Sequence, residues 1–255
     1  MKLPGAAAIH LWCVANTSLQ QADLAILDAE ELLRYRRIAA PELKQQFWQT
    51  RLAIRHVLSL YAPQVPASQW RFARNAHGKP ELEAPLFPCP LRFNITHTPG
   101  IIVIAVCTGG ELGVDVEHGA RSSRRLAVAE RYFSAPEVSA LRLLDDAQQR
   151  ERFTALWTLK EAYSKACGVG LANVLGGVSF HLQAQAIDVR FSPQRDELAA
   201  PWRFWQLRMA GAYRVALALR RDTHPTAYTL EAMELRDWRE VLPMQVAITA
   251  CTRAS

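Results

Sequence analysis

Three carboxylates and one lysine in this sequence lie at spacings that suit phosphate chemistry. Asp115 and Glu117 are separated by one residue in an apolar, strand-like run, so their side chains project from the same face. Glu161 and Lys165 are four residues apart in a helix-like segment and therefore share one side of that helix. Held on rigid elements, such a set can bind a hard divalent cation beside a phosphate. The simpler interpretation is an acidic strand edge and an unrelated helical ion pair.

Further polar residues can also bind phosphate. Thr96 and His97 end a short strand-like segment, and both a hydroxyl and an imidazole can donate to phosphate oxygens. Lys79, between a glycine and a proline in a turn, can reach a phosphate as a point charge. Each has a structural alternative, because a single histidine is often structural and a loop lysine is usually exposed to solvent.

Composition narrows the class of protein. Half of the 255 residues are apolar, and the formal net charge is +6. This composition indicates a globular protein with a substantial core, and the charge indicates an anionic partner: a phosphate ligand, a nucleic acid or an acidic protein. The five cysteines are scattered without a Cys-x-x-Cys pair. They argue against a disulfide framework or a zinc site and favour a reducing cytoplasm.

The sequence also bears on membranes and targeting. An apolar run near the N-terminus is interrupted by Pro4, Gly5 and His10, so we expect a first strand at 9–15 and no signal peptide. No apolar run approaches the length of a membrane-spanning helix. We therefore expect a cytoplasmic protein that does not enter a membrane.

Hydrophobic periodicity and turn residues divide the chain into alternating helices and strands. Helices are expected at 19–38, 41–61, 126–132, 136–144 and 148–167. Strands are expected at 9–15, 70–72, 93–97, 101–107, 112–118, 178–182, 187–191, 203–208 and 213–219. The glycine turn at 108–111 predicts that the two strands around it form an antiparallel hairpin.

The second half of the chain resembles the first in its order of elements. When the second half of the sequence is aligned with the first, Trp157, Glu161 and Lys165 fall on Phe47, Arg51 and Arg55. Both sets have the four-residue spacing of one helix side. We therefore predict an α+β protein of two similar subdomains, a pseudo-dimer in which each unit is a small antiparallel sheet packed with helices. The predicted units are 1–110, 111–225 with the acidic and lysine motifs, and a C-terminal extension at 226–255.

Four segments in order carry a resemblance to a known family. They are Gly78-Lys79-Pro80, Phe93-Asn-Ile-Thr-His97-Thr, Gly113-Val-Asp115-Val-Glu117, and Trp157-Thr-Leu-Lys160-Glu161-Ala-Tyr-Ser-Lys165. The ordered set resembles the 4′-phosphopantetheinyl transferases, particularly the larger, monomeric group of the surfactin-synthetase-activating type. The resemblance implies coenzyme A and Mg²⁺ bound between two α+β subdomains. It also implies transfer of the phosphopantetheine arm to a serine of an apo acyl or peptidyl carrier protein, with release of adenosine 3′,5′-bisphosphate.

The same resemblance implies a role for each site residue. Asp115, Glu117 and Glu161 would hold the metal, with Glu161 also a candidate base and Lys165 stabilising charge on the transferred phosphate. The residues implied in binding the nucleotide's phosphates are Thr96, His97, Lys79 and Lys165. Members of the family often grip the 3′-phosphate with an early basic residue, for which the candidates are Arg51, Arg34 and Arg37.

Two other functions are compatible with parts of this pattern. A metal-dependent nuclease would use the acidic residues and the basic charge, but it leaves Lys79 and the strand that ends at His97 unexplained. A non-catalytic relative that binds coenzyme A or a carrier would not need Lys165 and all three carboxylates. We expect a transferase without a nucleic-acid partner, and a basic docking surface for an acidic carrier helix at 119–125. A solvated arginine loop is the alternative for that segment.

Overall fold

The computed structural model describes residues 1–15, 24–83, 91–118, 125–169, 177–195, 198–199 and 201–252. Its helices are α1 (Ala29–Arg37), α2 (Pro41–Tyr61), α3 (Arg125–Tyr132), α4 (Ala135–Arg142) and α5 (Asp146–Cys167). The strands of the first half are β1 (Ala8–Ala15), β2 (Phe72–Arg74), β3 (Pro80–Leu82), β4 (Leu91–Thr98), β5 (Ile101–Thr108) and β6 (Glu111–His118). Those that follow are β7 (Val178–Leu182), β8 (Ile187–Phe191), β9 (Trp202–Met209), β10 (Tyr213–Arg220), β11 (Thr229–Arg236), β12 (Glu240–Pro243) and β13 (Ala247–Cys251). The predicted α+β class is confirmed.

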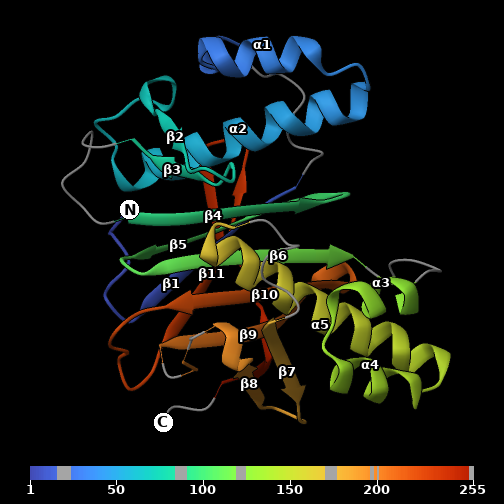
Figure 1. Ribbon diagram of the computed structural model, residues 1–255. Coiled ribbons are helices and arrows are strands. Elements are labelled where there is room, and N and C mark those ends of the chain that lie inside the picture. Colours follow the sequence, from blue (N-terminus) through green and yellow to red (C-terminus); the bar gives the residue numbers. More distant parts are fainter. Residues whose placement is uncertain are drawn as a thin grey trace.

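The core clusters define four layers in the order α2, sheet, sheet, α5. Figure 1 shows α2 above the strands and α5 crossing β6 and β10. One sheet has the strand order β12-β11-β1-β5-β4, and the other has the order β13-β9-β10-β6. Alternate residues of β5 explain the stacking: Ile102 and Ile104 pack under α2, whereas Ile101 and Val103 pack against the second sheet. Because both faces of β5 are covered, its sequence is a continuous apolar run rather than an alternating one.

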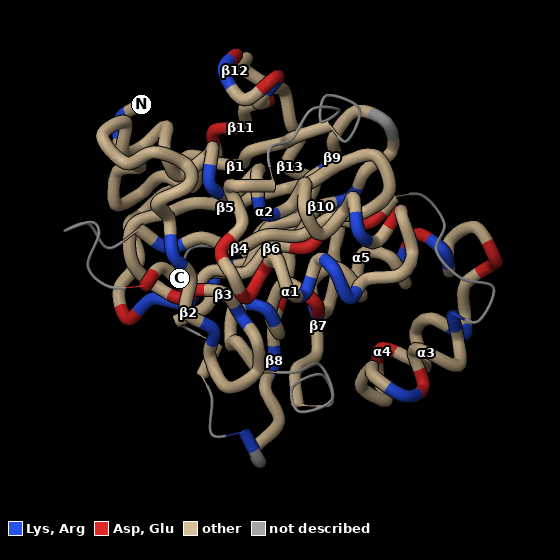
Figure 2. The backbone as a smooth tube through the Cα atoms, turned by 90° about the horizontal axis from the view of Figure 1, so that it is seen from above, with Lys and Arg blue, Asp and Glu red and all other residues tan. Residues whose placement is uncertain are grey.

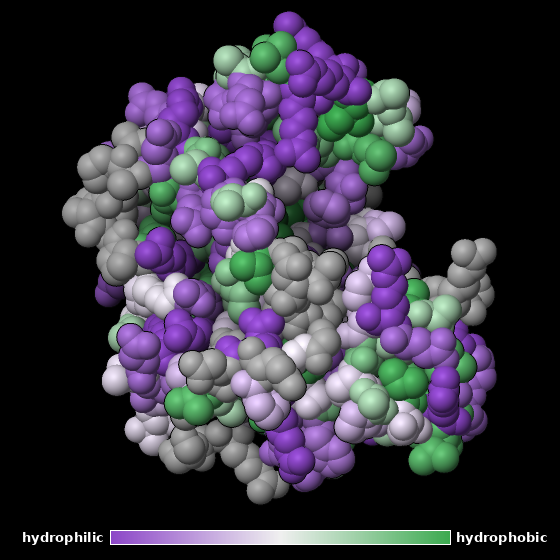
Figure 3. Space-filling view, in the orientation of Figure 1, coloured by the Kyte–Doolittle hydropathy of each residue, from purple (hydrophilic) through white to green (hydrophobic). Residues whose placement is uncertain are grey.

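The two sheets meet along their edge strands, β4 and β6. Asn94 of β4 accepts a hydrogen bond from the backbone N–H of Val114 in β6 at 2.9 Å, so a buried side chain bridges the two edges. Figure 3 shows a recess between the part of the molecule that contains α1 and α2 and the part that contains α3 and α4. We refer to the β4–β6 junction, with α5 lying against it, as the seam.

The predicted hairpin between residues 101–107 and 112–118 is wrong. β5 pairs with β1 and β4, whereas β6 pairs with β10, so the chain passes from one sheet to the other between them. Gly109 and Gly110, with φ of 71° and 82°, make that crossing in a backbone conformation that favours glycine. Asp115 nevertheless lies near the strand of His97, because β4 and β6 adjoin at the seam.

The C-terminal segment takes part in both sheets. β11 runs parallel to β1 and carries β12 on its other side, and β13 pairs with β9 in the second sheet. Among the described residues, no helix is long and apolar enough to span a membrane. Lysines and arginines are spread along the chain with acidic residues among them (Figure 2).

Helix α5 has clear start and stop signals. Asp145 and Gln148 form a capping box at its beginning, each side chain accepting from the other residue's backbone N–H. Gly168 ends the helix in the left-handed region with φ of 66°. The Asn75 amide donates to the Gly168 carbonyl at 2.8 Å, which fixes the end of α5 to the first half of the chain.

Gly113 lets α5 lie directly on β6. A Cβ at this position would stand 1.9 Å from the Ala162 carbonyl oxygen and 2.5 Å from the Ala166 backbone nitrogen. Both are backbone atoms of the helix, so no side-chain rotation can relieve the overlap. The glycine therefore sets how closely the helix approaches the acidic strand.

We expect Gly113→Ala to push α5 away from β6 and to destabilise the fold by about 1–3 kcal/mol, the usual cost of overpacking. Urea unfolding measures this effect. Gly5→Ala is the control, because nothing lies within 4 Å of a Cβ built there. Equal stability of the two variants would contradict the close contact.

Candidate active site

Asp115, Lys165 and Thr96 meet at the seam from three different elements. The Lys165 ammonium donates to Asp115 Oδ1 at 2.6 Å and to Thr96 Oγ1 at 2.9 Å. The Thr96 hydroxyl in turn donates to Asp115 Oδ1 at 3.1 Å. β6, α5 and β4 each contribute one residue, so the arrangement of the two sheets and the helix creates this triangle.

The second oxygen of Asp115 has no hydrogen-bond partner. Asp115 is buried, with 5% of the residue exposed, and its Oδ2 is enclosed without a donor. A buried carboxylate oxygen in that state costs free energy unless a ligand satisfies it. Lys165 is about a quarter exposed, at 29% of its side chain, so the triangle is open to solvent on the side of the lysine.

Glu117 and Glu161 lie along the same contact between β6 and α5. Glu117 is buried and accepts a hydrogen bond from the Trp157 indole N–H at 3.2 Å. Trp157, Glu161 and Lys165 follow each other at intervals of four residues on α5. Trp157 contacts Glu117, and Lys165 contacts Asp115, so this side of α5 faces β6. Glu161, which is half-buried, lies between them on the same side of the helix.

The oxygens at the seam fit a hard cation. Among the described residues, no three His, Cys, Asp or Glu side chains are grouped closely enough to hold a metal. Magnesium commonly takes only one or two carboxylates and completes its shell with water and phosphate oxygens. The unpartnered Oδ2 of Asp115, with Glu117 on the same strand face, provides such a partial set. Glu161 remains the predicted third ligand.

Lys160, the neighbour of Glu161, faces the core. Its ammonium is fully buried, 3.0 Å from Glu137 Oε2, and donates to the Val178 carbonyl at 2.6 Å. Glu137 also accepts from the backbone N–H of Phe180 at 2.8 Å. Burial lowers the pKa of Lys160, and the adjacent Glu137 carboxylate opposes that shift. The pair fixes α5 against α4 and β7, and thereby the rotation of α5 about its axis.

Lys79 joins the last turn of α5 to β6. Its ammonium donates to the Ala166 carbonyl of α5 at 2.8 Å and to the Leu112 carbonyl of β6 at 3.3 Å. Burial lowers its pKa, with Glu81 as the largest opposing influence. Lys79 therefore bridges helix and strand beside Gly113, and its predicted contact with a phosphate stays a prediction.

A basic strip leads from the seam toward α1 and α2. His97 is exposed at the end of β4, yet partial desolvation lowers its pKa, and the positive charges of Lys165 and Arg51 lower it further. Arg51 contacts Glu31 at 3.2 Å, and burial lowers the Arg51 pKa to about 10. Arg51, Arg34 and Arg74 line one small hollow, together with the carboxylates of Asp28, Glu30 and Glu31.

Sequence reasoning identified part of this strip. Arg34 and Arg51 were candidates, whereas Arg74 was missed, although it stands directly before the Asn75 turn. Arg37, the third candidate, is exposed at the end of α1. Residues 119–124, most of the predicted docking segment, lie outside the described residues, while Arg125 pairs with Asp146.

The site combines carboxylates, a lysine and a basic strip on an α+β scaffold, as expected of an enzyme that handles a phosphorylated substrate. The family model of the 4′-phosphopantetheinyl transferase superfamily matches residues 111–218. A putative 4′-phosphopantetheinyl transferase of Synechocystis sp. is 34% identical over 170 residues, 66% of this chain and 68% of the relative. The transferase HetI of Nostoc sp. is 34% identical over 169 residues, 65% of this chain and 71% of the relative.

Sfp of Bacillus subtilis, also named a 4′-phosphopantetheinyl transferase, is 29% identical over 171 residues, 67% of this chain and 72% of the relative. The chain belongs to the 4′-phosphopantetheinyl transferase family. It is therefore a transferase of the kind that takes coenzyme A as substrate and acts on carrier proteins, which confirms the family predicted from the ordered motifs.

The buried ion pair of Lys160 and Glu137 should contribute to the free energy of unfolding. Lys160→Met leaves a buried carboxylate without its cation, so we expect a loss of about 3–5 kcal/mol in urea unfolding. Adding Glu137→Gln should recover part of that loss, because the amide carries no charge. Exposed Lys2→Met is the control, with an expected effect within about 0.5 kcal/mol. A Lys160→Met variant as stable as the control would show that the pair does not anchor α5.

Proposed function

We propose that this protein transfers the 4′-phosphopantetheine arm of coenzyme A to a serine hydroxyl of an apo acyl or peptidyl carrier protein, with Mg²⁺, and that the seam is its active site. The observation that carries this proposal is the convergence of Asp115, Thr96 and Lys165 beside an unpartnered carboxylate oxygen. In the reaction, the serine oxygen forms a bond to the β-phosphorus as the bond to adenosine 3′,5′-bisphosphate breaks.

The charges at the seam suit a pyrophosphate. Lys165 and Thr96 supply donors from two elements, and His97 adds an exposed imidazole at the end of β4. Positioning of the reacting groups and neutralisation of charge provide most of the catalysis in phosphoryl transfer. Lys165 therefore stabilises the charge that is redistributed over the transferred phosphate.

The carboxylates have two tasks in this proposal. Asp115 and Glu117, with Glu161 as the third ligand, hold Mg²⁺, which supplies neutralisation of the pyrophosphate when bound. Glu161 accepts the serine proton directly or through a water molecule. Its place on the helix row between Trp157 and Lys165 supports that role.

The basic strip suits the 3′-phosphate of coenzyme A. Arg51, Arg34 and Arg74 line one hollow on the β4 side of the seam, opposite the carboxylates of Asp28, Glu30 and Glu31, and a phosphate would compete with these acids for the arginines. Arg51 is also close enough to His97 to lower its pKa. Arg51 is held by Glu31, so a phosphate would approach it from the side of the exposed residue Arg74. This assignment puts the nucleotide end of coenzyme A over β4 and α2.

The contacts among Asp115, Thr96 and Lys165 form within one chain and need no residue from a second copy. That supports a monomeric enzyme. In the described part of the chain, Cys13, Cys107 and Cys251 form no disulfide, which supports the proposal of a reducing cytoplasm.

Mass spectrometry of a carrier tests the reaction. An apo acyl carrier protein incubated with this protein, coenzyme A and Mg²⁺ should gain the mass of one phosphopantetheine group, and chelation should stop the gain. Asp115→Asn should raise the Mg²⁺ concentration needed for half-maximal rate. A nuclease would leave the carrier unchanged and cut DNA, and a non-catalytic binder would do neither.

Steady-state kinetics of Lys165 variants tests its role. Lys165→Ala should lower kcat by an amount equivalent to roughly 2–4 kcal/mol, as for other preorganised donors. Lys165→Arg should also lose turnover, since a planar guanidinium cannot take the position of the ammonium. The KM for coenzyme A should change less than kcat in both. Turnover equal to that of the control Lys2→Ala would exclude Lys165 from the chemistry.

A comparison of coenzyme A with 3′-dephospho-coenzyme A as substrates tests whether Arg74 binds the 3′-phosphate. Arg74→Ala should raise the KM for coenzyme A about tenfold, equivalent to roughly 1.4 kcal/mol, and leave the KM for 3′-dephospho-coenzyme A unchanged. Arg71→Ala is the matched control, because Arg71 is also exposed and donates to the nearby Ser68 and Trp70 carbonyls. An equal rise for both substrates would mean that Arg74 does not contact the 3′-phosphate.

A further inference from the structure

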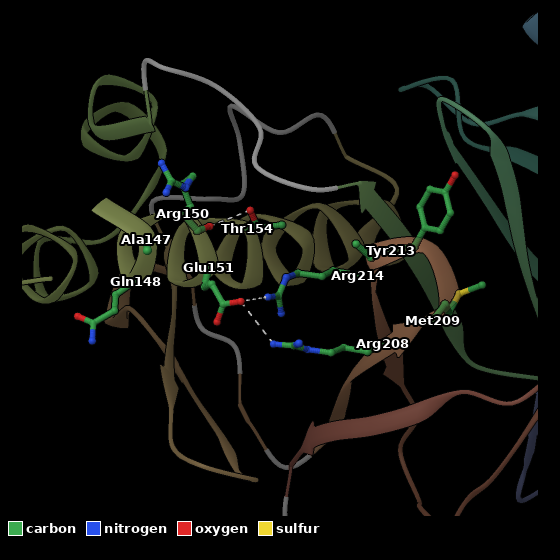
Figure 4. A pocket seen from close by; sticks show the side chains of 10 residues that line it. Ala147, Gln148, Arg150, Glu151, Thr154, Arg208, Met209, Tyr213 and Arg214 are labelled. Atoms are coloured by element: carbon green, nitrogen blue, oxygen red, sulfur yellow. Dashed lines mark hydrogen bonds and ion pairs between the residues drawn. The ribbon is translucent and has the colours of Figure 1, made fainter. Parts of the chain in front are cut away.

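A hollow of about 500 Å³ opens between the beginning of α5 and the β9–β10 hairpin. Figure 4 shows Arg208 and Arg214 extending from the hairpin toward Glu151 on α5. Arg214 lies 2.6 Å and Arg208 3.5 Å from the same carboxylate oxygen, Oε1 of Glu151. We call these three residues and the space around them the hairpin hollow.

The charges in the hairpin hollow are unequal. Two guanidinium groups share the single carboxylate of Glu151, and a third arginine of the lining, Arg150, is paired with Asp146. Burial lowers the pKa of Arg214, and the charge of Arg208 lowers it further, as expected where two cations are close together. One positive charge therefore lacks a partner within the group of Arg208, Arg214 and Glu151.

Exposure differs among the three residues. The side chain of Glu151 is 62% exposed and that of Arg208 is 54% exposed, whereas Arg214 is only 23% exposed. A solvent-exposed ion pair contributes little stability, so an incoming carboxylate can replace Glu151 at small cost. The rest of the lining is mixed, with apolar Ala147, Met209 and Ala212 beside polar Gln148 and Thr154. The lining therefore suits an amphipathic helix that carries acidic side chains.

The hairpin hollow also lies on the appropriate side of the seam. Arg214 is the ladder partner of Glu117, and cross-strand partners project from the same face of a sheet. The hollow thus lies on the β10 side of the acidic strand, whereas Arg51 and Arg74 lie on the β4 side. In phosphoryl transfer the attacking and leaving oxygens are roughly in line. An acceptor serine would therefore approach from the side opposite the nucleotide.

We propose that the hairpin hollow is a docking site for the carrier protein, in which Arg208 and Arg214 bind an acidic side chain of the serine-bearing helix in place of Glu151. This inference rests on the proposed function, because it names the surface that receives the acceptor. It differs from the predicted docking segment at 119–125 in the residues that make the contact.

Binding of an apo acyl carrier protein, with acidic residues on its serine-bearing helix, tests the inference without catalysis. Isothermal titration calorimetry without coenzyme A or metal should show Arg208→Glu weakening binding about tenfold. Glu151→Gln should strengthen it about twofold, because the internal competitor is lost. The matched controls, Arg239→Glu and Glu240→Gln, change the same charges at exposed positions by β12, an edge strand of the other sheet, and should leave binding unchanged.

A charge swap completes the experiment. A carrier with one helix acid changed to lysine should bind wild type weakly and should regain affinity for the Arg208→Glu variant. The KM for coenzyme A should be the same in wild type and Arg208→Glu.

Three results would overturn the inference: binding changes no larger than those of the controls, no rescue by any swapped carrier, or a rise in the KM for coenzyme A alone. Loading of the carrier by wild type is measured separately. Failure of that reaction would therefore count against the proposed function and not against docking.

Discussion

The direct contact between α5 and β6 at Gly113 is the constraint on which the site depends. Backbone atoms of the helix lie where a side chain of the strand would otherwise project, so helix and strand are as close as the two elements can be. At that distance, the row of Trp157 and Lys165 reaches the carboxylates of Glu117 and Asp115 with hydrogen bonds of 3.2 Å and 2.6 Å. A wider gap would leave those carboxylates buried and without donors, which is costly in a protein interior.

The lysines of this region differ in burial and in the contacts that hold them. Lys160 is paired with Glu137 in the core and fixes the rotation of α5, whereas Lys79 fixes the last turn of the helix to β6. Both ammonium groups are held by several acceptors, and burial lowers the pKa of each. Lys165 is the more exposed member and donates to Oδ1 of Asp115, the carboxylate whose Oδ2 has no partner. Helix α5 thus carries Lys160, which fixes its position, and Lys165, five residues later, which is open to a ligand.

The sequence was sufficient to predict most elements of the fold and the motifs of the site, because these depend on local periodicity and spacing. Asp115 and Glu117 are two residues apart on a strand, and that spacing alone places them on one face. Pairing between strands was harder. The turn at Gly109 and Gly110 has the residues of a hairpin, yet the chain changes sheets there, because β5 already has β1 and β4 as partners. Arg74, Glu137 and Arg214 could not be assigned, since their importance comes from contacts with residues distant in sequence.

Burial and exposure explain why charge is arranged asymmetrically around the seam. On the β4 side, Arg55 is fully buried and bound by Glu31 at 2.7 Å, so the acid that restrains Arg51 is itself fixed. On the β10 side, the acid between Arg208 and Arg214 is largely exposed and belongs to a surface turn of α5. A fixed acid keeps the first set of cations in one geometry, which suits a ligand of constant shape. An exposed acid that can be displaced leaves the second set adaptable, which suits a protein surface that varies from partner to partner.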